Sequence, residues 1–406
     1  MTASIARTQP RSNAAPIYLD YQATTPLDRR VLDVMLPYFT EKFGNPGSVT
    51  HAYGREAETA VERSREEVAA LIGAEPREIV FTSGATESNN LALKGAARFH
   101  RALGKDHIVT LATEHKCVLE SCAALRREGF RVSVLPVDAG GLVDVAALAA
   151  ALGEHTAVVS VMAAHNEIGV LQPLAEIGAL CRAKGVLLHS DAAQAVGKAA
   201  IDVDAMNIDL LSISGHKIYG PKGIGALYVR RQPRARIAPL IDGGGQERGL
   251  RSGTLPTPLC VGLGAAAALA KAEMPVESER LLGLRRRLLA GLRARLPRMG
   301  LNGDPERRLP GNLNLSFPGV PALELMEACP ELAISTGSAC TAAEVEPSYV
   351  LRALGLSEAL AGSSIRLGLG RYTTEREVDF AVETLAAAVR RLTGQERMTP
   401  RLSTPT

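Results

Sequence analysis

The stretch Gly185–Val229 reads GVLLHSDAAQAVGKAAIDVDAMNIDLLSISGHKIYGPKGIGALYV and contains three short apolar runs. The runs GVLLHSD, IDLLSIS and GALYV each have the length of a strand and carry little charge. Because strands of a parallel sheet are buried on both faces, they read as continuous apolar runs without alternation. We therefore predict three buried strands, with polar residues at the carboxyl ends of the first two.

Four further runs upstream extend this pattern, and helix-like segments separate them. They are REIVFTSG, HIVTLAT, RVSVLPV and TAVVSVMAA. Strand-length runs that alternate with helical segments predict an α/β domain around a mostly parallel sheet. A long helical pattern from about Pro258, followed by NLNLSFPG, LAISTGSAC and SSIRLGLGRY, predicts a smaller α+β domain. We place the large domain at residues 28–272 and the small one at 1–27 and 273–406.

The composition narrows the classes of function. The chain has 406 residues and a net charge of +3, with both signs mixed along its length, so we expect neither nucleic acid nor a membrane as partner. Its six cysteines lack a C-x-x-C pair, which predicts a reducing cytoplasm and no structural metal. The start MTASIARTQPRSNAAP lacks a secretory apolar core, which leaves a disordered tail or an organelle transit peptide.

Ligands of open α/β sheets lie at the carboxyl ends of the strands, where three groups of candidates follow apolar runs. Ala85 and Thr86 open a helix and could cradle a phosphate. In the second group, Asp191 ends the run GVLLHSD and Gln194 lies in the turn that follows. Taken singly, Thr86 and Asp191 could be helix caps, and Lys217 could be a surface lysine.

The third group contains Ser214, His216 and Lys217, in a tight loop flanked by glycine. A lysine crowded against a histidine is a candidate Schiff-base amine. Together, a phosphate site, an aspartate for a pyridine nitrogen and such a lysine are the fixtures that pyridoxal 5′-phosphate (PLP) requires.

The chain also resembles the cysteine desulfurases of the class V aminotransferase superfamily, nearly end to end. The motifs that carry the resemblance are YLDYQATTP, FTSGATESNN, TEHK, NEIGV, SDAAQAVGK, SGHKIYGPKGIGALY, GGGQERGLRSGT and STGSACTAAEVEPSYVLRALG. The resemblance implies the type I fold of PLP-dependent transferases and a PLP cofactor. It gives Lys217 the Schiff base, Asp191 the pyridine nitrogen and Gln194 the ring oxygen.

The same resemblance extends to the remaining cofactor and substrate contacts. His115 would stack on the ring and move protons, and Ala85, Thr86, Ser214 and His216 would bind the phosphate. Arg366, whose planar fork suits a carboxylate, would hold that of the substrate with Asn166 and Asn45. Asn166 is also expected near the cofactor.

Cys340 lies in STGSACTAAEVEP, a segment of small residues that suits a thiol that moves between the substrate and an acceptor. The segment resembles that of the long-loop desulfurases. We expect the other five cysteines to be buried and inert. These are Cys117, Cys122, Cys181, Cys260 and Cys329.

The implied reaction converts L-cysteine to L-alanine and leaves a persulfide on Cys340. A selenocysteine lyase or another class V aminotransferase remains an alternative, as does an inactive sulfur-transfer scaffold. The acceptor protein is left open among iron–sulfur assembly, tRNA thiolation, and thiamin or molybdenum-cofactor synthesis. The polar end GQERMTPRLSTPT leaves docking on a scaffold protein in doubt. The resemblance also predicts a homodimer in which Thr254 contacts the partner's phosphate site.

Overall fold

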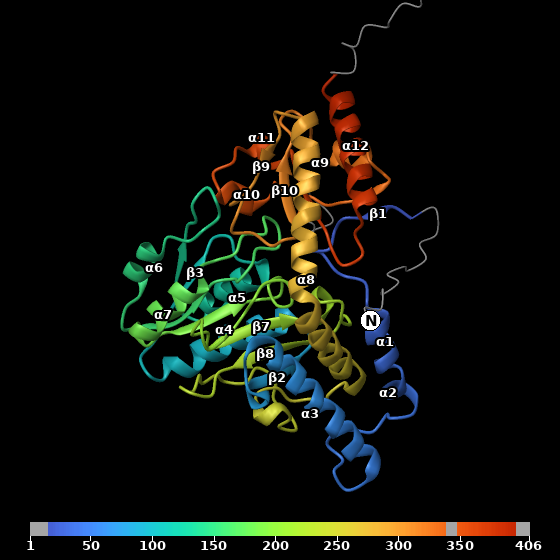
Figure 1. Cartoon of the computed structure of the whole chain (residues 1–406). Helices are drawn as coiled ribbons and strands as arrows, with labels where there is room; N and C mark the ends of the chain where they lie inside the picture. Colours follow the sequence, from blue (N-terminus) through green and yellow to red (C-terminus); the bar gives the residue numbers. More distant parts are fainter. Residues whose placement is uncertain (1–14, 338–346, 395–406) are drawn as a thin grey trace, which may run out of the picture.

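The larger sheet of the protein is mostly parallel. The computed structural model describes residues 15–337 and 347–394, and the seven strands of this sheet follow the order β2-β8-β7-β6-β5-β3-β4 (Figure 1). Their bounds are β2 Ile79–Thr82, β3 His107–Leu111, β4 Arg131–Leu135, β5 Thr156–Ser160, β6 Leu187–Asp191, β7 Leu210–Ser214 and β8 Gly225–Val229. β8 is antiparallel to both of its neighbours, β2 and β7, and the other strand pairs of this sheet in the described residues are parallel. All seven strands coincide with the predicted apolar runs, which confirms the predicted sheet.

Helices cover both faces of this sheet because its strands are apolar on both. Neighbouring residues of one strand belong to different core clusters: Ile108 packs in one and Val109 in the other. The first face is covered by α4 (Ala85–Arg101) and α5 (Lys116–Arg127). The second is covered by α3 (Ala52–Ile72), α6 (Val145–Ala151) and α7 (Leu174–Lys184), beyond which lie α1 (Arg29–Met35) and α2 (Pro37–Thr40).

The second part of the chain is smaller and α+β, as predicted. Its antiparallel sheet has the order β12-β10-β9, and a separate short pair joins β1 to β11. The strand bounds are β1 Ile17–Tyr18, β9 Gly300–Leu301, β10 Asn312–Ser316, β11 Leu332–Ala333 and β12 Ser364–Gly368. The helices are α9 Ala322–Glu327, α10 Tyr349–Ala353, α11 Glu358–Ala361 and α12 Glu375–Leu392.

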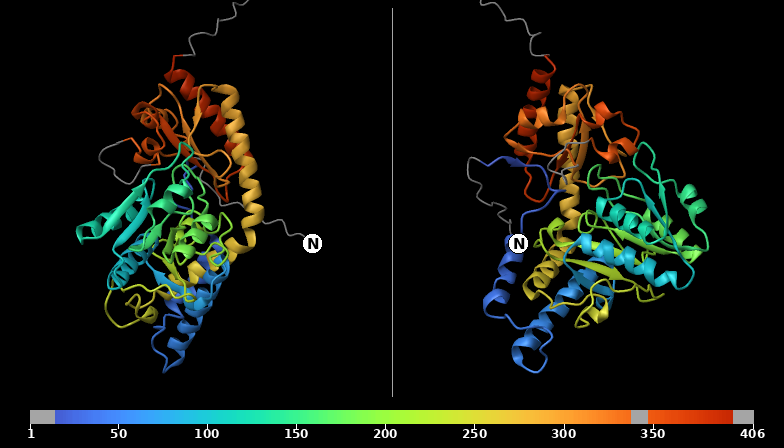
Figure 2. Two further views of the ribbon diagram at one scale, coloured as in Figure 1. Left: turned by 90° about the vertical axis from the view of Figure 1, so that its left-hand side faces the viewer. Right: turned by 180° about the vertical axis from the view of Figure 1, so that it is seen from behind.

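The helix α8 (Thr257–Arg295) joins the two parts (Figures 1 and 2). An 18-residue stretch of α8 has a mean hydropathy of 1.4. By length and composition, α8 alone among the described helices could therefore cross a membrane. However, α8 packs against α3 and α1 at one end and against α12 at the other. Its buried side chains contribute to two core clusters, as expected of the core helix of a globular protein.

We propose that the domain boundary in α8 lies where the sequence predicts it, between residues 272 and 273. Side chains of α8 up to Leu269 pack with the core of the large sheet, and those from Leu281 pack with the core of the small sheet. Leu19 also belongs to the second core, which supports assigning the N-terminal segment to the small domain. Limited proteolysis tests these bounds.

Candidate active site

A cavity of about 580 Å³ lies at the carboxyl ends of the central strands. Elements far apart in the sequence contribute to its wall, including the start of α4, the ends of β6 and β7, and β12 of the small sheet. Ten predicted site residues line it: Ala85, Thr86, His115, Asn166, Asp191, Gln194, Ser214, His216, Lys217 and Arg366. The cavity therefore lies at the strand ends, where ligands of open α/β sheets bind.

Lys217 is presented by a single 3-10 turn, Gly215–Lys217, which follows β7. Its Nζ donates hydrogen bonds to the carbonyl oxygens of Gln22 at 2.6 Å and Ala23 at 2.7 Å. The N-terminal segment that supplies these carbonyls was quoted in the motif YLDYQATTP, but no role was predicted for its residues. The amine is thus held at the cavity wall by the backbone that follows β1.

Asp191 is the last residue of β6, and its carboxylate is buried and held from two sides. Oδ1 accepts a hydrogen bond from the backbone N–H of Ala193 at 3.0 Å, and Oδ2 accepts one from Asn89 Nδ2 at 2.7 Å. These bonds fix the plane of the carboxylate, as a partner of a ring nitrogen requires. Asn89 lies on α4 within the motif FTSGATESNN, and sequence reasoning did not assign it.

His115 caps the start of α5 and lies against the thiol of Cys117. Its Nδ1 accepts a hydrogen bond from the backbone N–H of Cys117 at 3.2 Å and lies 3.1 Å from Sγ. Because Nδ1 accepts, the neutral ring carries its proton on Nε2. Burial lowers the pKa of His115, and the positive charge of Lys217 acts in the same direction, whereas Asp191 opposes both. The imidazole therefore favours its neutral form.

The start of α4 is open to an anion. Its first flanking residue, Gly84, has a φ of +147° and no side-chain cap, so the first N–H groups of the helix are left for a ligand. Gly225 of β8 allows the close approach, since a Cβ there would lie 2.7 Å from Gly84 Cα. Burial and nearby lysines lower the pKa of His216 to about 4, and its Nδ1 lies 3.0 Å from Thr24 Oγ1.

Arg366 enters the cavity from β12 of the small sheet. Nη2 donates to Asp20 Oδ1 at 2.7 Å and to Ser335 Oγ at 2.9 Å, and Nη1 donates to the carbonyl oxygen of Asn166 at 3.0 Å. Its buried Nε has no hydrogen-bond partner among the described residues. The described residues therefore leave one guanidinium donor unsatisfied, while Asp20 supplies a counter-charge that the sequence analysis did not predict.

Comparison with known proteins decides the family. Residues 17–380 match the aminotransferase class-V family. The chain belongs to the aminotransferase class-V family. A cysteine desulfurase of Pongo abelii is 59% identical over 377 residues, which cover 93% of this chain and 82% of that protein. Cysteine desulfurase IscS of Rickettsia bellii is 57% identical over 385 residues, which cover 95% and 94%.

Solved structures agree with this assignment. A NifS-like protein superposes with a TM-score of 0.86 at 37% identity and covers 93% of this chain and 100% of that chain. The structure of SspA in complex with cysteine gives a TM-score of 0.78 at 42% identity and covers 88% and 99%. Within the class-V family the chain is a cysteine desulfurase, and these enzymes use PLP.

The cavity of this class-V enzyme fits PLP by its chemistry. It offers an open helix start for the phosphate, an amine for the aldehyde and a fixed carboxylate for the ring nitrogen. Among residues 15–337 and 347–394, no group of three or more His, Cys, Asp or Glu side chains could hold a metal ion. The open helix start, the amine and the carboxylate form a donor set that suits an organic phosphate cofactor.

Two of the predicted site residues that the structure describes, Asn45 and Thr254, do not line this cavity. Asn45 is exposed and its Oδ1 accepts a hydrogen bond from the N–H of Gly47 at 2.9 Å, and Thr254 is exposed on a loop. Cys340 lies outside the described residues, although Gly337, three positions earlier, lines the cavity. The roles of these three residues stay predictions.

The structure corrects the expectation for Cys117. This residue was expected in the core, but its side chain is half-buried and lines the cavity. Its position directly after the His115 turn of the TEHK motif was the signal available in the sequence. Burial and the neighbouring Asp191 raise the pKa of the thiol to about 12, so it stays protonated at neutral pH.

Proposed function

We propose that this chain transfers the sulfur of L-cysteine to Cys340, releasing L-alanine. The observation that carries the proposal is the convergence of Lys217, Asp191 and Arg366 from three distant elements on one cavity. In balance, the carbon–sulfur bond of the substrate breaks and a sulfur–sulfur bond forms. The Cys340 thiol becomes a persulfide, and the carbon skeleton leaves as alanine.

The described residues divide the work of holding PLP. Lys217 would bind its aldehyde carbon, Asp191 its ring nitrogen and Gln194 its ring oxygen, while Ala85, Thr86, Ser214 and His216 would bind its phosphate. When bound, PLP supplies an electron sink that makes the substrate's α-proton acidic. Held from two sides by Ala193 and Asn89, the Asp191 carboxylate is oriented for this task.

Other residues of the same cavity would handle the substrate. Arg366 would hold the α-carboxylate with Asn166, because a guanidinium fork offers paired donors at fixed geometry. The Lys217 amine takes the α-proton of the substrate and returns a proton to carbon. His115, with its proton on Nε2, would stack on the ring and pass a proton within the cavity.

The proposal extends to the sulfur acceptor and to the pairing of two chains. The persulfide sulfur passes to an acceptor protein of the cytoplasm, and mass spectrometry of proteins that co-purify identifies which pathway receives it. Two chains pair, because α1, α2, the connection from α2 to α3 and the start of α3 expose apolar side chains that a monomer rarely leaves in water. These are Val34, Leu36, Phe39, Phe43, Val49 and Tyr53.

The experiment is turnover of L-cysteine by the PLP-loaded protein with a thiol reductant, following alanine and sulfide together. Equal amounts of the two products, and loss of both in Lys217→Ala, support the proposal. An aminotransferase would instead yield a keto acid. A selenocysteine lyase would turn over L-selenocysteine and leave L-cysteine unchanged. Either result would refute the proposed reaction.

A further inference from the structure

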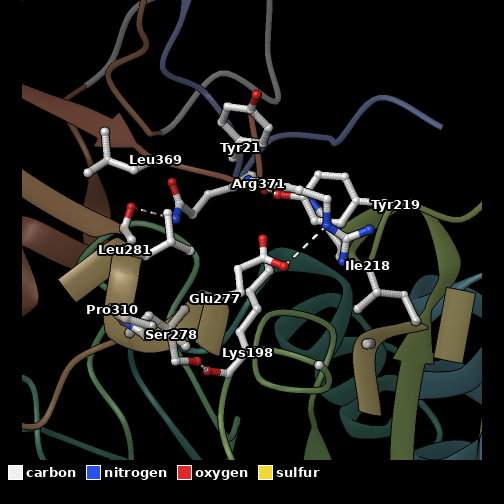
Figure 3. A pocket seen from close by; sticks show the side chains of 16 residues that line it. Tyr21, Lys198, Ile218, Tyr219, Glu277, Ser278, Leu281, Pro310, Leu369 and Arg371 are labelled. Carbon is white, nitrogen blue, oxygen red and sulfur yellow. Dashed lines mark hydrogen bonds and ion pairs between the residues drawn. The ribbon is translucent and has the colours of Figure 1, made fainter. Parts of the chain in front are cut away.

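A second and much smaller cavity, of about 30 Å³, lies behind Lys217, which lines both. It has space for about one water molecule. Figure 3 shows its polar wall, where Lys198 extends toward Glu277 and Arg371 bonds Glu277, at 3.2 Å between Nε and Oε2. None of the reaction steps above uses Lys198.

The backbone fixes Lys198 beside the cofactor site. The preceding Gly197 has a φ of +73°, and a Cβ there would lie 2.9 Å from Ile218 Cγ2, so only glycine makes this turn easily. From α8, Ser278 Oγ donates to the carbonyl oxygen of Lys198 at 3.3 Å (Figure 3). The lysine side chain thus starts from a turn that is fixed on both sides.

The Lys198 side chain meets Gln194, the residue assigned to the ring oxygen. Lys198 Nζ donates to Gln194 Oε1 at 3.1 Å, and Gln194 Nε2 donates to the carbonyl oxygen of Gln22 at 2.8 Å. The same carbonyl accepts from Lys217 Nζ. An ammonium group can only donate, so it fixes which end of the amide is oxygen. The second hydrogen of Nε2 is then available to the cavity that Gln194 lines.

We propose that Lys198 is a positioning residue, which holds the Gln194 amide so that an N–H, and not a carbonyl oxygen, meets the ring oxygen of the cofactor. The inference rests on the proposed function, because it assumes that Gln194 contacts that oxygen. Without Lys198 the amide can rotate and place oxygen against oxygen. Binding of the cofactor then weakens because a donor is lost and an acceptor replaces it.

The charges around Lys198 set the conditions of the test. Burial, followed by Lys217, lowers the pKa of Lys198 to about 7, Glu277 opposes this, and Arg366 adds a smaller lowering effect. Lys198 can donate to Gln194 Oε1 both as an ammonium group and as a neutral amine, but the neutral amine can also accept a hydrogen bond. Measurements at pH 6 keep the ammonium form in excess.

The test is a double-mutant cycle on the apoprotein, with the Kd of PLP measured by equilibrium dialysis. The variants are Gln194→Ala, Lys198→Met and the double variant, since methionine keeps most of the length of the lysine side chain but removes the donor. We expect each single change to raise Kd by about tenfold, and the double change to be no worse than Gln194→Ala. Lys198→Arg, which keeps a donor, should recover most of the affinity.

Two controls separate positioning from folding. Lys105→Met removes another half-buried lysine donor, whose Nζ donates to the carbonyl oxygen of Gly185 at 2.7 Å. Neither Lys105 nor Gly185 lines the cavity, so this change should leave the Kd of PLP unchanged. The visible absorption maximum of the bound cofactor should shift in Lys198→Met but not in Lys105→Met, because only the former alters the contact to the ring oxygen.

The outcomes are distinct. The inference is overturned if the double variant raises the Kd of PLP by the product of the two single effects, or if Lys198→Met leaves Kd unchanged. Either result leaves the proposed function intact. An unchanged Kd in Gln194→Ala would instead refute the assigned contact of Gln194, and the inference with it. Coupled losses with recovery in Lys198→Arg support it.

Discussion

Arg366 Nη2 donates a hydrogen bond to Asp20 Oδ1 at 2.7 Å, so the guanidinium assigned to the substrate's carboxylate already holds a carboxylate of the chain itself. The Arg366 side chain is only 4% exposed, compared with 19% for Asp20. A charge this buried needs a partner in the absence of substrate. Asp20 supplies it.

The first prediction therefore concerns Arg366→Lys. Lysine keeps the positive charge but offers no planar fork, so we expect KM for L-cysteine to rise at least about tenfold, with a smaller fall in kcat. Steady-state kinetics on the PLP-loaded protein measures both. The Kd of PLP should stay near the wild-type value. An unchanged KM would remove Arg366 from the substrate site.

The second prediction separates the ring chemistry from the sulfur transfer. Cys340→Ser should still change the absorption spectrum of the bound cofactor when L-cysteine is added, because Lys217 and Asp191 are intact, but it should release no sulfide. Cys117→Ser is the matched control, since the raised pKa of Cys117 makes it a poor nucleophile; its sulfide release should persist. Sulfide release at the normal rate by Cys340→Ser would exclude it as the sulfur acceptor.

The third prediction is a pH dependence of stability from His189. This histidine is fully buried in β6 between Ser160 and Ser212, and burial lowers its pKa to about 3. The unfolded chain, with a histidine pKa of about 6.5, binds the proton first, so stability is lost as pH falls from about 6.5 toward 3. One such group contributes a slope of about 1.4 kcal/mol per pH unit.

His189→Asn should remove that share of the slope. Urea unfolding of the apoprotein at pH 7, 6 and 5 measures it, and the exposed His155→Asn serves as the control. Equal slopes in His189→Asn and the wild type would show that His189 is not held neutral in the folded protein. The comparison of slopes remains valid even if His189→Asn lowers stability at every pH.

The sequence predicted the parts of the site that depend on local pattern. The seven strands are encoded by apolar runs, and parallel strands bring their carboxyl ends to one edge, so Asp191, Ser214 and Lys217 could be placed together before the structure was known. Motif resemblance added His115 and Arg366, whose elements lie far from these strands in the sequence.

The partners of these residues could not be predicted in the same way, because long-range packing places them. Gln22 is 195 positions from Lys217, and Asp20 is 346 positions from Arg366. No periodicity links residues across such distances. The predicted role of Thr254 involves a second subunit, so the structure of a single chain does not test it.

The last prediction tests this second copy. Thr254 is exposed here and does not line the cavity of its own chain. If it contacts the phosphate of the partner subunit, Thr254→Glu should weaken PLP binding, because two like charges about 4 Å apart repel by about 4 kcal/mol at an effective dielectric of about 20. Lys217→Ala should also be inactive.

Co-expression of the two inactive variants discriminates between sharing and independence. In a mixed dimer that shares Thr254, one site carries both defects and the other carries neither, so desulfurase activity should return to at most about half of the wild-type value per dimer. If Thr254 serves its own subunit, both sites stay damaged. Mixed dimers isolated by two affinity tags, with no recovered sulfide release, would therefore exclude a shared site, and recovered activity would establish the homodimer as the catalytic unit.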